Sequence, residues 1–130
     1  MNRCLAWASL LLLCAALAAC SSGPVRRVSP PAASIQQLTV NADGSWSVDL
    51  RLQNYSSIPM QFTSATLAIA VSDQAAGTLL GKPQISIGPE SADVVTLPFK
   101  PTVEARIVVA DALAGRRSLG YALKGTLDAV

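Results

Sequence analysis

Alternation of apolar and polar residues over eight positions is the feature that most constrains how this chain folds. The apolar positions are Trp46, Val48, Leu50 and Leu52, and polar or charged residues fill the positions between them. A period of two places successive side chains on opposite faces of a β-strand. The sequence therefore predicts a strand over residues 46–53 with one face on a core and the other in water.

Further short apolar runs, each bounded by turn residues, continue this pattern along the chain. They cover residues 35–40, 67–71, 79–87, 94–99 and 119–127. Asp43-Gly44 lies between the first two strands and is a hairpin signal, so we expect these strands to be antiparallel neighbours. Several short strands at this spacing predict an all-β, antiparallel β-sandwich. The side chains that we expect in its core are Trp46, Leu50, Leu52, Ile69, Val71, Leu97, Tyr121, Leu123 and Leu127.

The segment before the last strand follows a helical period instead. Its apolar positions at helical spacing are Val103, Ile107, Ala110 and Leu113. Thr102 can begin a helix here and Gly115 can end it. The β-branched run Ile107-Val108-Val109 leaves a strand as the alternative, and we favour the helix. In the last strand, Gly125 indicates a bulge or a close approach of another segment.

The N-terminus has the three-part layout of a cleaved export signal. A basic start, Met1-Asn2-Arg3, precedes an apolar run and then the small residues before Cys20. Leu17-Ala18-Ala19-Cys20 resembles the lipobox of bacterial lipoprotein signals. That resemblance implies that signal peptidase recognises Leu17, Ala18 and Ala19, removes residues 1–19 as a signal helix, and leaves Cys20 as the lipid-bearing N-terminus. A retained membrane helix is the alternative, but about seventeen apolar residues is the shortest length that spans a bilayer.

Residues 20–34 form an expected tether between the lipid and the domain at 35–130. This stretch is rich in serine, proline and glycine and has no apolar periodicity. We interpret Arg26 and Arg27 as solvated linker residues, with contact to anionic headgroups as the alternative. In lipoproteins of bacteria with two membranes, Asp after the cysteine resembles an inner-membrane retention signal. Ser21 therefore implies sorting to the outer membrane, with the domain facing the periplasm.

Composition excludes several functional classes for the mature chain. Removing Arg3 with the signal leaves nine basic against eight acidic residues, which gives no basic surface for nucleic acid. The chain has no histidine, and its cysteines are Cys4, Cys14 and the acylated Cys20, so a histidine base and a free thiolate are both lacking. No metal-ligand spacing or phosphate loop occurs, and we expect no cofactor and no metal. Glu90 and Asp93 are a conceivable acid–base pair, but a solvated turn is the favoured interpretation.

Several segments together resemble the type 2 late-embryogenesis-abundant (LEA) domain, also called the water-stress and hypersensitive-response domain. The matching segments are residues 48–54, ending in Asn54; Ile58-Pro59-Met60; Gly77 to Gly81; Ile87-Gly88-Pro89 with Val94 to Pro98; and residues 121–127. The family commonly has Asn-Pro-Asn after its first long strand, where this chain has Asn54-Tyr55-Ser56. The resemblance implies a fibronectin-like or immunoglobulin-like sandwich with one short helix before the last strand.

Two functions follow from these features. The first is a non-catalytic envelope lipoprotein, held on the membrane by its lipid, whose sandwich acts as an interaction or stress-protective module for an envelope protein partner. The second is a periplasmic carrier of a lipid or an extended peptide. An apolar cavity open to solvent favours the carrier, whereas a filled core favours the interaction module.

Overall fold

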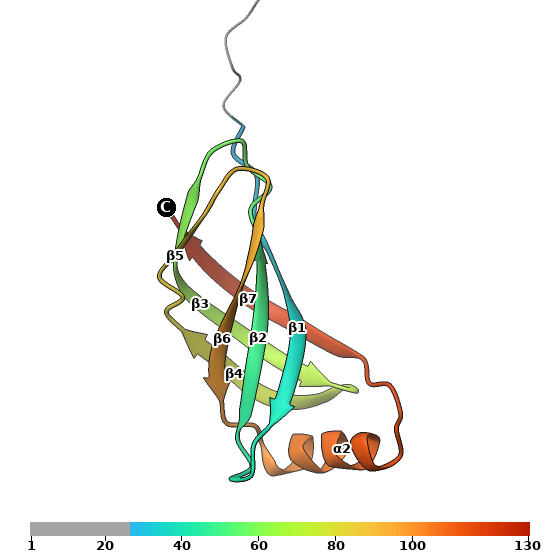
Figure 1. Ribbon diagram of the computed structural model, residues 1–130. Coiled ribbons are helices and arrows are strands. Elements are labelled where there is room, and N and C mark those ends of the chain that lie inside the picture. The colour runs from blue at the N-terminus through green and yellow to red at the C-terminus, as the bar shows by residue number, and fades with distance from the viewer. Residues whose placement is uncertain (1–26) are drawn as a thin grey trace, which may run out of the picture.

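The computed structural model describes residues 27–130, which form two antiparallel sheets and one helix (Figure 1). The elements are β1 (Ala32–Val40), β2 (Trp46–Gln53), β3 (Met60–Val71), β4 (Gln74–Gly81), β5 (Ile85–Ile87), β6 (Ala92–Phe99), α2 (Val103–Ala114) and β7 (Tyr121–Ala129). This architecture confirms the all-β sandwich and the short helix before the last strand. The predicted signal helix at residues 1–19 lies outside the described residues.

The first sheet has the order β1-β2-β6 and is antiparallel throughout. The predicted hairpin joins β1 to β2: the amide of Asn41 donates to the carbonyl of Ser45 at 2.8 Å, and Gly44 has a φ of 88° that suits glycine. The hydroxyl and then the backbone amide of Ser45 donate to the carboxylate of Asp43, at 2.6 and 3.0 Å. These bonds favour the charged form and lower the pKa of Asp43 from its ordinary value.

The second sheet is built around β3, the longest strand. One edge of β3 pairs with β4 and β5, and its other edge pairs with β7. Gly125 in β7 lies opposite Leu67. A Cβ at Gly125 would lie 1.9 Å from the carbonyl oxygen of Thr66, so the close approach predicted at this glycine is confirmed.

The core lies between the two sheets. Its largest fully buried apolar side chains are Trp46, Val48, Leu50, Leu52, Phe62, Ile69 and Leu79. The burial of alternate residues in β2 confirms the predicted strand face. Three residues of β7 depart from the expected core: Leu123 and Leu127 are half-buried, and Tyr121 is 45% exposed. The reason is that β7 is an edge strand, where the facing sheet covers inward side chains only in part.

Helix α2 begins and ends where the sequence predicts. The hydroxyl of Thr102 accepts a hydrogen bond from the amide of Ala105 at 3.2 Å, and Gly115 ends the helix. The residues whose spacing predicted the helix are not those that it buries, which are Ala105, Val109 and Ala112. All residues of α2 except Glu104, Arg106 and Asp111 are apolar, so periodicity does not single out one face. Small alanines on the buried face let the helix lie close to β4.

The folded domain begins earlier than the predicted boundary at residue 35. Strand β1 starts at Ala32, and Arg27 already contacts the loop after β2. The amide of Arg27 donates to the hydroxyl of Ser57 at 2.6 Å, and the carbonyl of Arg27 accepts from the amide of Ser57 at 2.8 Å. Its guanidinium pairs with Glu90 at 2.6 Å. Arg27 therefore belongs to the folded domain and not to the linker, although its side chain is solvated as expected, with 51% of it exposed. Arg26 lies outside the described residues.

Asn54 joins the two loops at this end of the sandwich. Its fully buried side-chain NH2 lies within hydrogen-bond distance of three carbonyl groups, which share its two hydrogens: those of Ile58 at 2.9 Å, Ile87 at 3.1 Å and Gly88 at 3.0 Å. Its carbonyl oxygen accepts from the amide of Ser56 at 2.8 Å. Asn54 thus holds the loop after β2 against the loop after β5.

Candidate functional site

The residues predicted to direct lipidation lie outside the described part of the chain. They are Leu17, Ala18, Ala19, Cys20 and Ser21. Over residues 27–130, no helix combines the length and apolar character needed to cross a membrane. The same residues contain no group of three His, Cys, Asp or Glu side chains that could hold a metal ion.

Glu90 and Asp93 do not form a pair. The carboxylate of Glu90 binds the guanidinium of Arg27, and both side chains are more than half exposed. The carboxylate of Asp93 accepts a hydrogen bond from the amide of Val94 at 2.8 Å. The two acids thus have separate partners, and this turn has no geometry for general acid–base catalysis.

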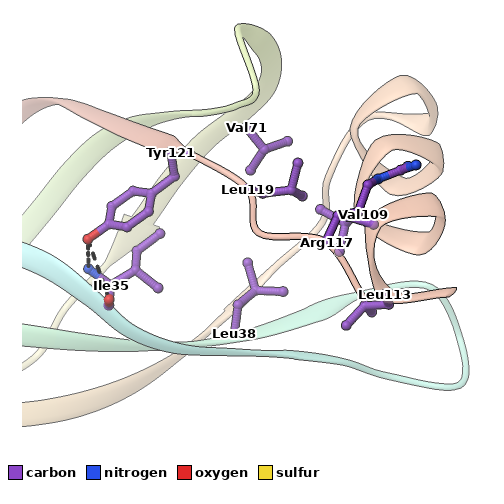
Figure 2. A pocket seen from close by; sticks show the side chains of 10 residues that line it. Ile35, Leu38, Val71, Val109, Leu113, Arg117, Leu119 and Tyr121 are labelled. Carbon is purple, nitrogen blue, oxygen red and sulfur yellow. Dashed lines mark hydrogen bonds between the residues drawn. The ribbon is translucent and has the colours of Figure 1, made fainter. Parts of the chain in front are cut away.

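A solvent-open apolar groove lies where the two sheets meet the C-terminal half of α2 (Figure 2). We call it the α2 groove, and its volume is about 230 Å³. Its lining residues are Ile35, Leu38, Val71, Val109, Ala112, Leu113, Arg117, Leu119, Gly120 and Tyr121. They come from β1, from the end of β3, from α2 and from the segment that leads into β7. Arg117 is the only charged residue among them, so the groove suits an apolar group.

Tyr121 spans the open side of the sandwich beside this groove. Its hydroxyl accepts from the amide of Ile35 at 3.0 Å and donates to the carbonyl of the same residue at 3.4 Å, as Figure 2 shows. Ile35 lies in β1, an edge strand that pairs only with β2. The tyrosine therefore satisfies two backbone groups on the free edge of β1 and joins that edge to β7.

The polar rim of the groove is formed by Arg117. Its guanidinium pairs with the carboxylate of Asp111 in the last turn of α2, and both side chains are largely exposed. The amide of Arg117 also donates to the carbonyl of Ala112 at 2.8 Å, which fixes the chain after the helix. An exposed ion pair of this kind contributes little to stability. The guanidinium is therefore free to exchange Asp111 for another anion at small cost.

A second hollow continues along the same open side. It has a volume of about 240 Å³ and is lined by Pro31, Ala33, Leu67, Leu123, Gly125 and Leu127. Ile35 and Tyr121 line the end of the α2 groove that is nearest to this second hollow along β1 and β7. Tyr121 therefore stands between two hollows on the side of the sandwich where β1 and β7 face each other.

The sequence pattern did not predict the α2 groove. The alternation placed Tyr121 in the core, and Ile35 and Leu38 were ordinary strand residues in that interpretation. The exposed flank of the groove is Leu113, whose side chain is 62% exposed. The one available signal was the apolar character of α2 on every face, which exceeds what a helix covering one end of a sandwich needs.

Comparisons of this chain with family models, with curated proteins and with solved structures found no match. The protein is therefore classified by its fold and its groove: it is an all-β sandwich with an apolar groove beside the one helix that the structure describes.

Proposed function

We propose that this protein is a non-catalytic lipoprotein of the cell envelope, anchored through Cys20, whose sandwich is an interaction or stress-protective module. In this proposal its binding surface is the α2 groove, its partner is an envelope protein, and the domain faces the periplasm from the outer membrane. The kinship with the LEA type 2 domain is part of the proposal. The sandwich with one short helix before its last strand is the observation that supports this kinship.

The size of the α2 groove is the observation that favours a protein partner. Sites for small molecules commonly measure about 300–1,000 Å³, and the groove measures about 230 Å³. It therefore accommodates one or two large side chains better than a whole lipid. Insertion of an apolar or aromatic side chain into such a hollow is the usual centre of a protein interface.

The exposed apolar side of α2 extends this surface. Leu113 and Ile107 are both 62% exposed, and Val103 is 56% exposed. The fully buried part of a protein interface is apolar and poor in charge. A partner covering the groove would bury Leu113 first, because Leu113 lines the groove and Ile107 does not.

The anchoring part of the proposal is tested at Cys20. We expect Cys20→Ser to abolish acylation and to leave unprocessed precursor, because serine has no thiol to receive the diacylglyceryl group. Growth with a radioactive fatty acid followed by gel analysis measures both effects. Label that persists on the Cys20→Ser protein would refute the anchor.

The binding part is tested with two matched variants of α2. Leu113→Arg and Ile107→Arg make the same chemical change at equally exposed positions of one helix, but only Leu113 lines the groove. Cross-linking in native membranes, followed by purification of this protein, compares the partner bands. We expect Leu113→Arg to lose a band that Ile107→Arg and the wild type retain. Identical band patterns from all three proteins would refute the groove as the binding surface.

A carrier of a lipid or an extended peptide is the second candidate, and the second hollow favours it. Were Tyr121 to turn aside, the two hollows would lie end to end along β1 and β7. Titration with a fluorescent fatty acid tests the lipid form of this function. Saturable binding that Leu113→Arg weakens at least tenfold would support the lipid carrier, whereas absence of saturable binding would leave the interaction module as the better explanation.

A further inference from the structure

The chain enters the sandwich at the end opposite α2 (Figure 1). We call this end the entry tip and define it as residues 27–29 with loops 54–59 and 88–91. We infer that the entry tip rests on the headgroups of the membrane that holds the lipid of Cys20, with Tyr55 at the interface and α2 directed away from that membrane. This inference rests on the anchor proposed above and adds an orientation to it.

Hydrogen bonds fix where the anchoring segment leaves the domain. The backbone of Arg27 exchanges two bonds with Ser57, and its guanidinium pairs with Glu90. The amide of Ser29 donates to the hydroxyl of Ser56 at 2.8 Å, and that hydroxyl is 3.2 Å from the carbonyl of Ser29. The segment 27–29 is thus held on both loops of the tip. The distance from membrane to domain is then limited by the seven residues from Cys20 to Arg26.

This short connection excludes an orientation with α2 towards the membrane. Seven residues span at most about 25 Å when fully extended. Strand β3 runs from the entry tip at Met60 to the α2 groove at Val71, and its twelve residues span about 40 Å. With α2 on the bilayer, Arg27 would stand farther from the lipid than the connection reaches. Three arrangements remain: the domain rests upright on its tip, stands upright but clear of the bilayer within that reach, or lies on its side.

The chemistry of the tip favours the upright arrangement. Loop 54–59 contains no charged residue, and it exposes 49% of Tyr55 together with Pro59. Tyrosine is enriched at membrane–water interfaces, where its ring meets apolar chains and its hydroxyl meets water. The carboxylate in the other loop, Glu90, is paired with Arg27, which reduces its repulsion from anionic headgroups.

The upright arrangement also makes the α2 groove accessible. It places the groove about 40 Å from the anchoring membrane, at the far end of β3. A partner that reaches the groove would then be a protein of the aqueous compartment, or one attached to a structure on the far side of that compartment. Proteins embedded in the same bilayer would meet the side of the sandwich instead.

Quenching by brominated lipid tests the orientation. The lipoprotein is purified from membranes and reconstituted into phosphatidylcholine vesicles whose acyl chains carry bromine near the headgroup. Tyr55→Trp places an indole at the tip, and Ile107→Trp places one on the exposed side of α2 as the matched control. Trp46 is buried, gives the same background in both variants, and reports whether each one is folded.

We expect the bromine to remove about half of the added emission of Tyr55→Trp, because interfacial side chains lie roughly 5–10 Å into the headgroup–acyl boundary. We expect no change for Ile107→Trp. Quenching of both variants would mean that the domain lies on its side and would overturn the inference. Quenching of neither would show that the tip stands clear of the bilayer and would also overturn it.

A second sample separates this inference from the proposed anchor. The mature chain from Cys20 has one thiol, so maleimide lipid couples to Cys20 without help from the cell. Failure of acylation in cells would refute the anchor while leaving the coupled sample measurable. Equal quenching of the two variants in the coupled sample would refute the orientation even if the anchor is correct.

Discussion

Replacing Asn54 by alanine tests whether the loops of the entry tip depend on one buried amide. Two of the four side-chain hydrogen bonds of Asn54, to Ser56 and to Ile87, are fully buried, and the bonds to Ile58 and Gly88 are partly buried. Asn54→Ala removes all four and leaves the partner groups behind. We expect a large loss of stability, because each buried group without a partner is costly.

The magnitude follows from the two buried bonds. A buried donor or acceptor left without its partner costs about 1–3 kcal/mol. Water can reach the partly buried carbonyls of Ile58 and Gly88, so these add little. The free energy of unfolding should therefore fall by about 2–6 kcal/mol. For a domain of this size each 1 kcal/mol lowers the melting temperature by about 4–8 °C, so the expected shift is at least about 8 °C.

Asn54→Asp sharpens the test with a pH dependence. The introduced carboxylate still accepts from Ser56, but its second oxygen faces three carbonyl oxygens in place of a donor. Burial and these oxygens raise the pKa of the introduced carboxyl in the folded state. The folded state then binds more protons than the unfolded state, so stability rises as the pH falls. We expect the variant to be less stable than Asn54→Ala at pH 7 and to recover as the pH falls towards about 4.

Urea unfolding followed by the emission of Trp46 measures these changes. Gln53→Ala is the matched control, because Gln53 carries the same amide one position earlier and makes only exposed bonds. It donates to the carbonyl of Ser91 at 3.2 Å and accepts from the guanidinium of Arg51 at 3.4 Å. This control should cost less than about 0.5 kcal/mol. A loss below 1 kcal/mol for Asn54→Ala, or equal losses at both positions, would refute the argument.

Three further predictions concern the core, the first hairpin and the chemistry of the domain. Leu50→Ala should lower the free energy of unfolding by about 2–5 kcal/mol and Leu123→Ala by roughly half as much, since Leu50 is fully buried and Leu123 only partly; equal losses in urea unfolding would contradict this difference. In a carboxylate NMR titration the pKa of Asp43 should lie below its ordinary 3.8, and Ser45→Ala should raise it towards that value. Because folding lowers the pKa of Asp43, the stability that its carboxylate contributes is lost as the pH falls through the lowered pKa. An unchanged Asp43 pKa in Ser45→Ala would show that the hydrogen bonds from Ser45 are not the cause of the shift. The domain should keep its melting temperature in chelator and turn over no esterase, peptidase or glycosidase substrate; a fall of several degrees or measurable turnover would contradict the non-enzyme proposal.

The regular elements could be predicted because their signals are local. The two-residue period of β2, the Asp43-Gly44 hairpin and the ends of α2 at Thr102 and Gly115 each depend on neighbouring residues alone. The start of the domain could not be predicted in this way. Arg27 is held by Ser57 and Glu90, thirty and sixty-three residues away, and the local composition of the segment is that of a linker.

The candidate site belongs almost wholly to tertiary structure. In the alternation of β7, Tyr121 occupies a position expected to face the core. However, β7 is an edge strand, and the tyrosine hydroxyl instead binds the backbone of Ile35, which is 86 positions away in the chain. Whether an inward side chain is covered depends on which strand of the other sheet lies opposite, and the alternation does not contain that information.

What the sequence by itself determined was the all-β class, the strand faces, the hairpin and the helix, because each arises from the period and chemistry of adjacent residues. Only the tertiary structure decided which face of α2 is buried. The helix is apolar on almost every side, and the face that packs against the sandwich is the one with Ala105, Val109 and Ala112. The tertiary structure also decided that β1 and β7 are edge strands, so that the side of the sandwich between them stays open. The α2 groove lies on this open side, where the alternation of apolar residues around Tyr121 had predicted a filled core.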